Sequence, residues 1–331
     1  MISPAPLHLV LGEPAHGVAR YAVELADWLD AEVELDPDRV VAGQDVHLHV
    51  TDRLLGPDPG RLLDVVATLS RRCRLTLTLH DVPQPTDGAL AFERRVATYR
   101  ALVASASGWA TNSHHEAALV HRWCRPATPG TVVPLPVIPL GQASAAIEPG
   151  TVGVFGYVYP GKGHRPVLDA IGLLRRRGVP ARLVVLGGPA RFHAHDLDAL
   201  CERAEQLGVP TEITGRLPER DVAAALRSVD VPVVGHRNVS ASGSLNSWLA
   251  AGRRPLVRTG TYAREMAALR PGTVSLFEHG RLVSALAAAL ADPARTWLEA
   301  GADVRPGPAE TAEAYAGWWS ETTAAVDAVS A

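Results

Sequence analysis

Short apolar runs alternate with amphipathic segments along most of the chain, and this alternation constrains the fold more than any other sequence feature. In the first part of the chain, strand-like runs lie at 8–11, 46–50, 75–79 and 109–111. Apolar residues recur at helical spacing between and after these runs, at 18–29, 61–69, 90–103 and 113–123. Because strands that alternate with helices form parallel sheets with helices on both faces, we expect such a sheet here.

A proline-rich segment, 131–150, interrupts this rhythm, and we interpret it as a linker. A second series follows, with strands expected at 152–155, 183–186, 212–214, 231–234, 255–257 and 273–277, and helices at 167–177, 197–207, 220–227, 245–251 and 309–329. A chain of 331 residues is long enough for two domains. We therefore predict an α/β protein with two doubly wound, Rossmann-like domains, at 1–147 and 148–308, followed by a C-terminal helix within 309–331.

Charge and composition exclude several classes of protein. The formal net charge of −3 argues against a nucleic-acid binder or a polybasic membrane binder. No apolar run approaches the roughly 18–20 residues of a membrane span, and the N-terminus lacks the pattern of a signal peptide. Cys73, Cys124 and Cys201 lie far apart and are not spaced as metal ligands, as expected of reduced thiols. We therefore predict a cytoplasmic protein without a transmembrane segment, and peripheral membrane contact is not favoured.

A glycine-rich loop follows the first strand of the second series and contains Lys162, the only lysine among 32 basic residues. The sequence from Gly156 to Lys162 matches the phosphate-loop pattern G-x-x-x-x-G-K, but Gly163 stands where that motif needs Ser or Thr to hold magnesium. A glycine turn between strand and helix, with an ammonium beside it, suits a phosphate group. The alternatives are a tight turn with an exposed lysine and a P-loop nucleotide hydrolase.

The order of motifs resembles the GT-B glycosyltransferases, particularly the retaining GT4 family. The first glycine loop and helix of that family are similar to the segment from His16 to Leu25, and its strand-end histidine motif to the segment from Thr78 to Asp81. Further similar stretches are Asn112-Ser113, Leu186-Gly187-Gly188-Pro189, Thr214-Gly215-Arg216-Leu217 and Ala250-Ala251-Gly252 before Pro255-Leu256-Val257. The resemblance implies that the first domain shapes the acceptor site, the second binds a nucleotide sugar, and the last helix packs back across both.

The sequence departs from the family pattern at its charged donor-site positions. The family has two glutamates eight positions apart, and this chain has Val239 and Ser247 there. The arginine that accompanies the lysine is replaced by Tyr157. The glycine- and serine-rich loop from Ser240 to Ser244 remains, and its amides at a helix start suit a diphosphate. Asn238 or a serine would replace the carboxylate that grips the ribose.

The resemblance implies a set of site residues and a mechanism. The sugar would come from a UDP or GDP sugar as co-substrate, without a metal or another cofactor, and transfer would retain the anomeric configuration. In front-face transfer the departing phosphate oxygen takes the acceptor proton, and His80 positions the sugar. The catalytic residues would be His80, Lys162 and Gly17, the donor-binding residues Gly156, Tyr157, Lys162, Gly188, Gly215, Arg216, Asn238, Ser240, Ser242, Gly243, Ser244 and Leu245, and the acceptor-binding residues His16, Arg20, Asp81 and His114.

Two other functions stay open. A sugar-nucleotide epimerase of the same fold would need acid and base residues in the cleft, and the missing glutamates would suit a non-catalytic ligand-binding subunit. We interpret His193 and His195 as solvated loop residues rather than metal ligands, because the sequence offers no third ligand at a plausible spacing. Trp318 and Trp319 are expected to pack between the domains. The partners predicted are a nucleotide sugar and a small acceptor, bound by a monomer or a homodimer.

Overall fold

A computed structural model describes residues 5–14, 16–141, 144–191 and 193–330. The chain divides into two compact units: residues 1–136 together with 306–331, and residues 137–305. Each unit is an α/β structure around one six-stranded parallel sheet, as predicted from the sequence. The domain limits at 147/148 and 308/309, and the packing of the last helix on the second domain, stay predictions.

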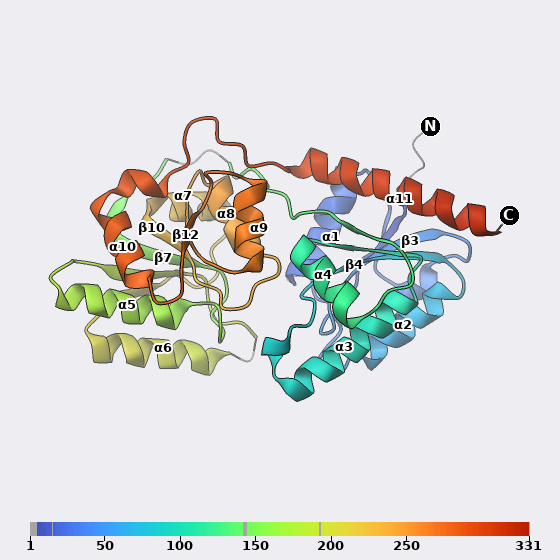
Figure 1. The fold of residues 1–331 in the computed structure, drawn as a ribbon, viewed down its shortest axis with the longest axis horizontal. Coiled ribbons are helices and arrows are strands. Elements are labelled where there is room, and N and C mark those ends of the chain that lie inside the picture. Colours follow the sequence, from blue (N-terminus) through green and yellow to red (C-terminus); the bar gives the residue numbers. More distant parts are fainter. Residues whose placement is uncertain (1–4, 15, 142–143, 192, 331) are drawn as a thin grey trace. The chain divides into compact units, whose positions relative to one another are not determined.

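The first unit has the strand order β2-β1-β3-β4-β5-β6 (Figure 1). Its apolar side chains form cores on both sides of the sheet: α2, α3 and α4 cover one face, and α1 and α11 cover the other. The elements are β1 (Leu7–Leu9), α1 (Gly17–Trp28), β2 (Val33–Glu34), β3 (Asp45–Val50), α2 (Gly60–Ser70), β4 (Arg74–Leu79), α3 (Ala89–Ala104), β5 (Gly108–Thr111), α4 (His114–Trp123), β6 (Gly130–Val132) and α11 (Pro308–Ser330).

The second unit has the strand order β12-β11-β10-β7-β8-β9. Helices α5, α6 and α10 pack on one face of its sheet, and α7, α8 and α9 pack on the other (Figure 1). The elements are β7 (Glu148–Phe155), α5 (His164–Arg176), β8 (Arg182–Leu186), α6 (Ala194–Leu207), β9 (Thr211–Ile213), α7 (Glu219–Ser228), β10 (Val229–Val234), α8 (Gly243–Ala250), β11 (Leu256–Arg258), α9 (Thr261–Leu269), β12 (Ser275–Phe277) and α10 (Leu282–Ala291).

The proline-rich segment 131–150 differs from the linker expected. Its first residues belong to β6, which extends the first sheet, and its last residues begin β7. Positions 142 and 143 lie outside the described residues. Four elements, β2, β6, α9 and α10, were not predicted from the sequence.

In both sheets, some crossover connections add strands on one side of the starting strand and others add them on the opposite side. In doubly wound sheets a crevice lies at the point where this direction changes. In the first unit, the chain passes from β1 through α1 to β2 on one side, and from β3 through α2 to β4 on the other. In the second unit, it leaves β7 through α5 to β8 and leaves β10 through α8 to β11. The adjacent pairs β1/β3 and β7/β10 therefore mark the points where ligands bind in such sheets.

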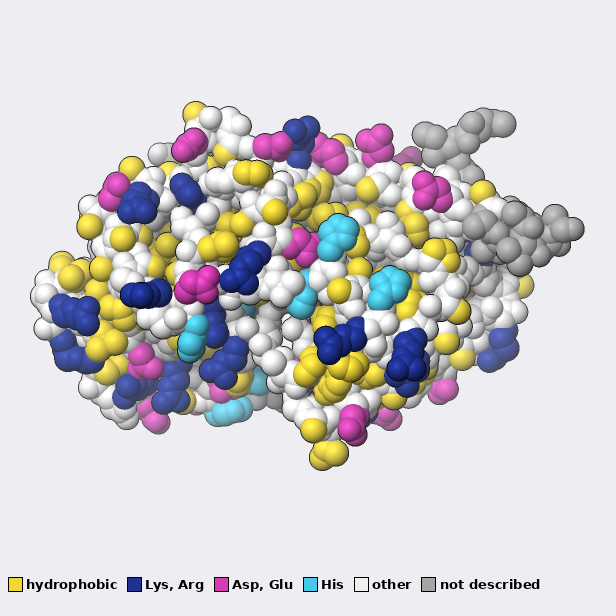
Figure 2. Space-filling model, viewed as in Figure 1, with side chains coloured by type: hydrophobic (Ala, Val, Ile, Leu, Met, Phe, Trp, Pro, Cys, Tyr) yellow, Lys and Arg dark blue, Asp and Glu magenta, His cyan; other side chains and the backbone are white. Residues whose placement is uncertain are grey.

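The last helix packs against the first unit with its aromatic side chains. Tyr315, Trp318 and Trp319 are buried together with Leu25 of α1. The tryptophan pair is thus covered by the first unit itself. Among the described residues, no helix is both long and apolar enough to cross a bilayer. On the visible surface of each unit, charged side chains of both signs are interspersed (Figure 2).

Four buried histidines occupy the interior beneath this helix: His8, His47, His49 and His80. His49 Nδ1 lies 3.0 Å from His80 Nε2, and both ring nitrogens of His47 bond to threonine hydroxyls at 2.9 and 3.0 Å. The ring of His8 packs against the rings of His47 and His49. Burial disfavours the charged imidazolium, so it lowers the pKa of His8 to about 4 and the pKa of His80 to about 3. The cluster is therefore neutral at pH 7.

This cluster predicts that the first unit loses stability as the pH falls below 6.5. The folded-state pKa values lie below the unfolded value, so between them the unfolded chain binds more protons and the free energy of unfolding decreases. Substituting His8→Phe should remove about 2–3 kcal/mol of the loss between pH 7 and pH 4. Urea unfolding across this range measures the difference, and His121→Phe at an exposed position is the control. Equal pH dependence in wild type and His8→Phe would contradict the prediction.

Candidate functional site

The crevice of the second unit lies between two loops that follow neighbouring strands. The loop after β7 ends in Gly163, and the loop after β10 begins with Gly235. A Cβ on Gly163 would lie 2.6–2.7 Å from the backbone of Gly235, and the φ of Gly163 is +109°. The amide of Arg237 also donates to the Gly161 carbonyl at 2.9 Å. These contacts hold the two loops together, and only glycine fits at position 163.

Lys162 is buried in this crevice, with 7% of its surface exposed. Its Nζ donates a hydrogen bond to Ser244 Oγ at 3.0 Å, and among the described residues no carboxylate pairs with it. Burial alone lowers the pKa of the ammonium to about 7. A buried cation without a counter-charge is costly, and an anion that entered the crevice would supply the missing charge.

The first turn of α8 lies beside Lys162 and offers hydrogen-bond donors. Ser242 caps this helix by accepting from the Leu245 amide at 3.2 Å, and its Oγ lies 3.3 Å from Ser244 Oγ. The Ser242 amide donates to the hydroxyl of Tyr262 at 3.1 Å, which fixes the loop. The N-terminus of a helix carries a partial positive charge that favours anions. The ammonium of Lys162 and the positive end of α8 therefore both attract an anion at the same position.

Two buried histidines flank Lys162 and were missed by the sequence analysis. His164 begins α5, and His236 follows Gly235. Burial, and then the charge of Lys162, lowers the pKa of His164 to about 3 and the pKa of His236 well below its usual value. Both rings are therefore neutral at pH 7 and can donate or accept hydrogen bonds. Their positions directly after Gly163 and Gly235 were the available signal.

The remaining residues predicted for the donor site divide by position. A Cβ on Gly188 would lie 3.8 Å from Gly215 Cα, so these two glycines form one edge of the crevice, next to Gly156. The side chains of Tyr157, Arg216 and Asn238 are exposed, Ser240 is buried, and Gly243 opens α8 with free space around it. Leu245 packs in the apolar core, so it presents only its backbone.

In the first unit, the predicted residues lie at the carboxyl edge of the sheet. His80 follows β4 and is held from two sides: His49 bonds to its Nε2, and the Tyr99 hydroxyl donates to its carbonyl. Asp81 has a φ of +52°, and its carboxylate accepts from Arg95 at 2.8 Å. A neutral imidazole at this place can orient a hydroxyl group, whereas its low pKa makes it a weak base.

The other first-unit residues come from the start of α1 and from α4. His16 caps α1 by accepting from the Val18 amide at 3.2 Å, and Arg20 pairs with Glu24 at 3.7 Å. A Cβ on Gly17 would meet no described atom within 4 Å, so packing within the unit leaves this position open. His114 is the exposed first residue of α4.

A group of possible metal ligands lies elsewhere in the second unit. The ligand atoms of His193, His195 and Asp196 come within 4.8 Å of one another. His193 Nδ1 lies 2.7 Å from Asp196 Oδ2, and both histidine side chains are substantially exposed. Asp196 is the third group that the sequence analysis did not find.

Comparison with solved structures identifies the fold. HepE of Anabaena, solved in complex with UDP and glucose, aligns with a TM-score of 0.67 at 14% identity, over 98% of both chains. The fold is that of the GT-B glycosyltransferases. Sucrose-phosphate synthase of Thermosynechococcus elongatus shares this GT-B fold with the same score, identity and coverage. A trehalose 6-phosphate synthase of Burkholderia multivorans aligns at 0.60 and 12% identity, over 90% of this chain and 74% of that one. No family model and no curated protein matches the sequence.

The contact between the two loops predicts unequal effects of two glycine substitutions. Gly161→Ala introduces a side chain at positive φ with free space around it, and we expect a cost of about 1 kcal/mol. Gly163→Ala adds a collision with the Gly235 backbone and should cost about 3 kcal/mol or more. Urea unfolding of the two variants tests this, and equal costs would show that the loops are not held together here.

Proposed function

We propose that the chain is a glycosyltransferase that moves a hexosyl group from a nucleoside diphosphate sugar to a small acceptor, with retention and without a metal. The observation that carries this proposal is Lys162, a buried cation without a carboxylate partner among the described residues, at the start of α8. Because the crevice supplies positive charge from the ammonium and from the helix start, it suits a diphosphate. The fold supports the same function, since HepE, which shares it, was solved with UDP and with UDP-glucose.

The chemistry follows from the charge that develops in the reaction. Breaking the bond between the sugar C1 and the phosphate oxygen leaves a cationic sugar and an anionic diphosphate. Lys162 and the Ser242–Ser244 donors stabilise the leaving diphosphate. The acceptor oxygen bonds to C1 on the same face, and its proton passes to the departing phosphate oxygen. No carboxylate nucleophile is needed on this path.

The first unit contributes orientation in this proposal. His80 is neutral and its Nε2 is engaged by His49, so its ring has one orientation and can hold a sugar hydroxyl. Gly17 leaves room for close approach of the donor. The finer assignments, namely UDP or GDP as nucleotide and His16, Arg20, Asp81 and His114 as acceptor residues, are parts of the same proposal.

The proposal predicts the behaviour of Lys162→Met, which removes the charge and keeps the length of the side chain. The free protein should keep or raise its melting temperature, because a desolvated charge is lost from the interior. The rise in melting temperature that UDP or GDP produces in wild type should disappear. Lys162→Arg should not restore it, because Lys162 is buried and a wide planar guanidinium cannot take the place of a compact ammonium there.

Two comparisons make this test decisive. Arg182→Ala, at the half-buried first residue of β8, should keep the full rise in melting temperature with UDP or GDP. Turnover of the nucleotide sugar that gives the largest shift, assayed with an acceptor panel in EDTA, separates a transferase from a binding subunit. If UDP or GDP still raises the melting temperature of Lys162→Met, the proposed donor site is wrong.

The pKa of Lys162 also predicts proton uptake on nucleotide binding. With a pKa of about 7, the free lysine is mostly neutral at pH 8.5, and a bound diphosphate restores its proton. We therefore expect close to one proton taken up at pH 8.5, almost none at pH 6, and a Kd that rises by about tenfold per pH unit above the pKa. His164 and His236 do not titrate in this range, because their pKa values are lowered.

Calorimetry in two buffers of different ionisation enthalpy measures the protons directly. The residual binding of Lys162→Met should show no pH dependence between pH 7.5 and 8.5, where the diphosphate is ionised and the base is largely protonated. Binding to wild type that is independent of pH across this range would show that Lys162 is not the group that holds the diphosphate.

A further inference from the structure

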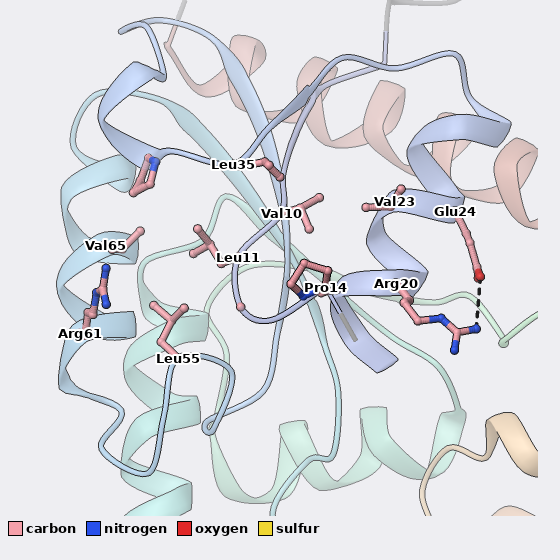
Figure 3. Close-up of a pocket in the computed structure, with 13 residues that line it drawn as sticks. Val10, Leu11, Pro14, Arg20, Val23, Glu24, Leu35, Leu55, Arg61 and Val65 are labelled. Carbon is pink, nitrogen blue, oxygen red and sulfur yellow. Dashed lines mark ion pairs between the residues drawn. The ribbon is translucent and has the colours of Figure 1, made fainter. Parts of the chain in front are cut away.

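A cavity of about 590 Å³ opens in the first unit, at the carboxyl end of β1 (Figure 3). Its position follows from the topology: α1 and α2 lie on opposite faces of the sheet, and the cavity lies between their first turns where β1 and β3 diverge. This is the point at which a doubly wound sheet binds ligands, and the volume is that of a small-molecule site. Its apolar wall includes Val10, Leu11, Val23, Leu35, Leu55 and Val65.

Some of these apolar side chains are exposed although the unit has a complete core. Val23 of α1 is 46% exposed, and Leu35, which follows β2, is 67% exposed. Side chains of this size gain free energy when a ligand removes them from water. The loop packs closely against Leu54, because a Cβ on Gly12 would lie only 3.0 Å from that residue. The apolar wall is therefore a formed surface that an apolar molecule would cover.

Three charged residues line the cavity, and their charges do not cancel. Arg20 and Glu24 pair with each other on α1, and Figure 3 shows the guanidinium of Arg20 directed to this partner. Arg61 lies across the cavity on α2, beside Val65, and has no ion pair among the described residues. One positive charge is thus available at the edge of an apolar wall, where an acidic group of a ligand would find it.

We propose that this cavity is the acceptor site and that the acceptor is an apolar molecule, of the size of two fused rings or a medium-length alkyl chain, which carries one acidic group besides the hydroxyl that receives the sugar. The apolar body lies against Val23 and Leu35, and the acidic group binds Arg61. The acceptor role rests on the proposed function, whereas the chemistry of the ligand rests on the cavity alone. Of the residues that the sequence predicts for the acceptor, only Arg20 lines this cavity.

Matched probes test the two parts of the proposal. 6-Hydroxy-2-naphthoate and 2,6-dihydroxynaphthalene share the ring body and a hydroxyl, and only the first is an acid. We expect the acid to bind wild type with one site by calorimetry, about tenfold more tightly than the neutral compound. Arg61→Gln should weaken the acid to the affinity of its neutral analogue, and Val23→Asp should weaken both compounds by at least tenfold.

The controls are residues of the same types outside the cavity. Arg71→Gln, at the other end of α2, and Leu90→Asp, an exposed leucine of α3, should leave binding of both probes unchanged. All four substitutions are at exposed positions, and circular dichroism confirms that each variant is folded. Absence of saturable binding, or binding that Val23→Asp does not weaken, overturns the site. Equal affinity for the two probes overturns the acidic group.

Nucleotide binding is measured on the same variants and separates this inference from the proposed function. A rise in melting temperature with UDP or GDP that persists in every cavity variant, while the acid binds wild type and the controls more tightly than it binds the cavity variants, supports both. If UDP or GDP raises the melting temperature but neither naphthalene probe binds, the acceptor cavity is overturned and the proposed donor site is still supported. Probe binding without a nucleotide shift overturns the acceptor role, because the chain would then lack a donor.

Discussion

In a parallel sheet all strands end at the same edge, so the reversal of crossover direction decides where this molecule can do chemistry. The reversal occurs once in each sheet, between β1 and β3 and between β7 and β10. At each reversal the helices leave to opposite faces, and the space between their first turns stays open. One crevice holds Lys162 and the start of α8, and the other is the cavity lined by α1 and α2. The two sites follow from the same constraint.

Much of the fold could be predicted because its strands are buried on both faces. Residues such as 75–79 and 231–234 are continuous apolar or β-branched runs, which the sequence shows directly. The strands that were missed have no such signal. β2 spans only Val33–Glu34, and β6 lies in a proline-rich stretch and forms because β5 provides an edge. Pairing with a neighbouring strand creates these elements, and the pairing is not local in the sequence.

The candidate site could be predicted only where one segment carries it. Lys162 was found because glycines surround it within a single loop. His164 and His236 were missed because their importance arises from the adjacency of β7 and β10, which are far apart in the chain. The apolar cavity draws its lining from five segments, and only one of them, 19–24, lies in a stretch that the family resemblance singles out. Physical proximity, rather than residue type, defines these parts of the site.

The other buried cations show that an unfilled partner is unusual in this structure. Arg95 bonds to Asp52, Asp81 and Asp87, and Arg253 bonds to several backbone carbonyls and to Thr296. Both guanidiniums are thus held by the chain itself. Among the described residues, Lys162 Nζ hydrogen-bonds to a neutral hydroxyl, that of Ser244, and a Cβ at position 156 would crowd it at 3.0 Å.

A chain that otherwise uses arginine for its basic residues has therefore kept its single lysine where the charge must be small and buried. Because the described part of the chain supplies no anion there, the free energy lost by desolvating this ammonium is offset either by loss of its proton or by a ligand. A ligand that brings negative charge to the start of α8 does so in the bound state alone. Binding of a diphosphate therefore recovers the free energy that the unpaired ammonium costs the free protein.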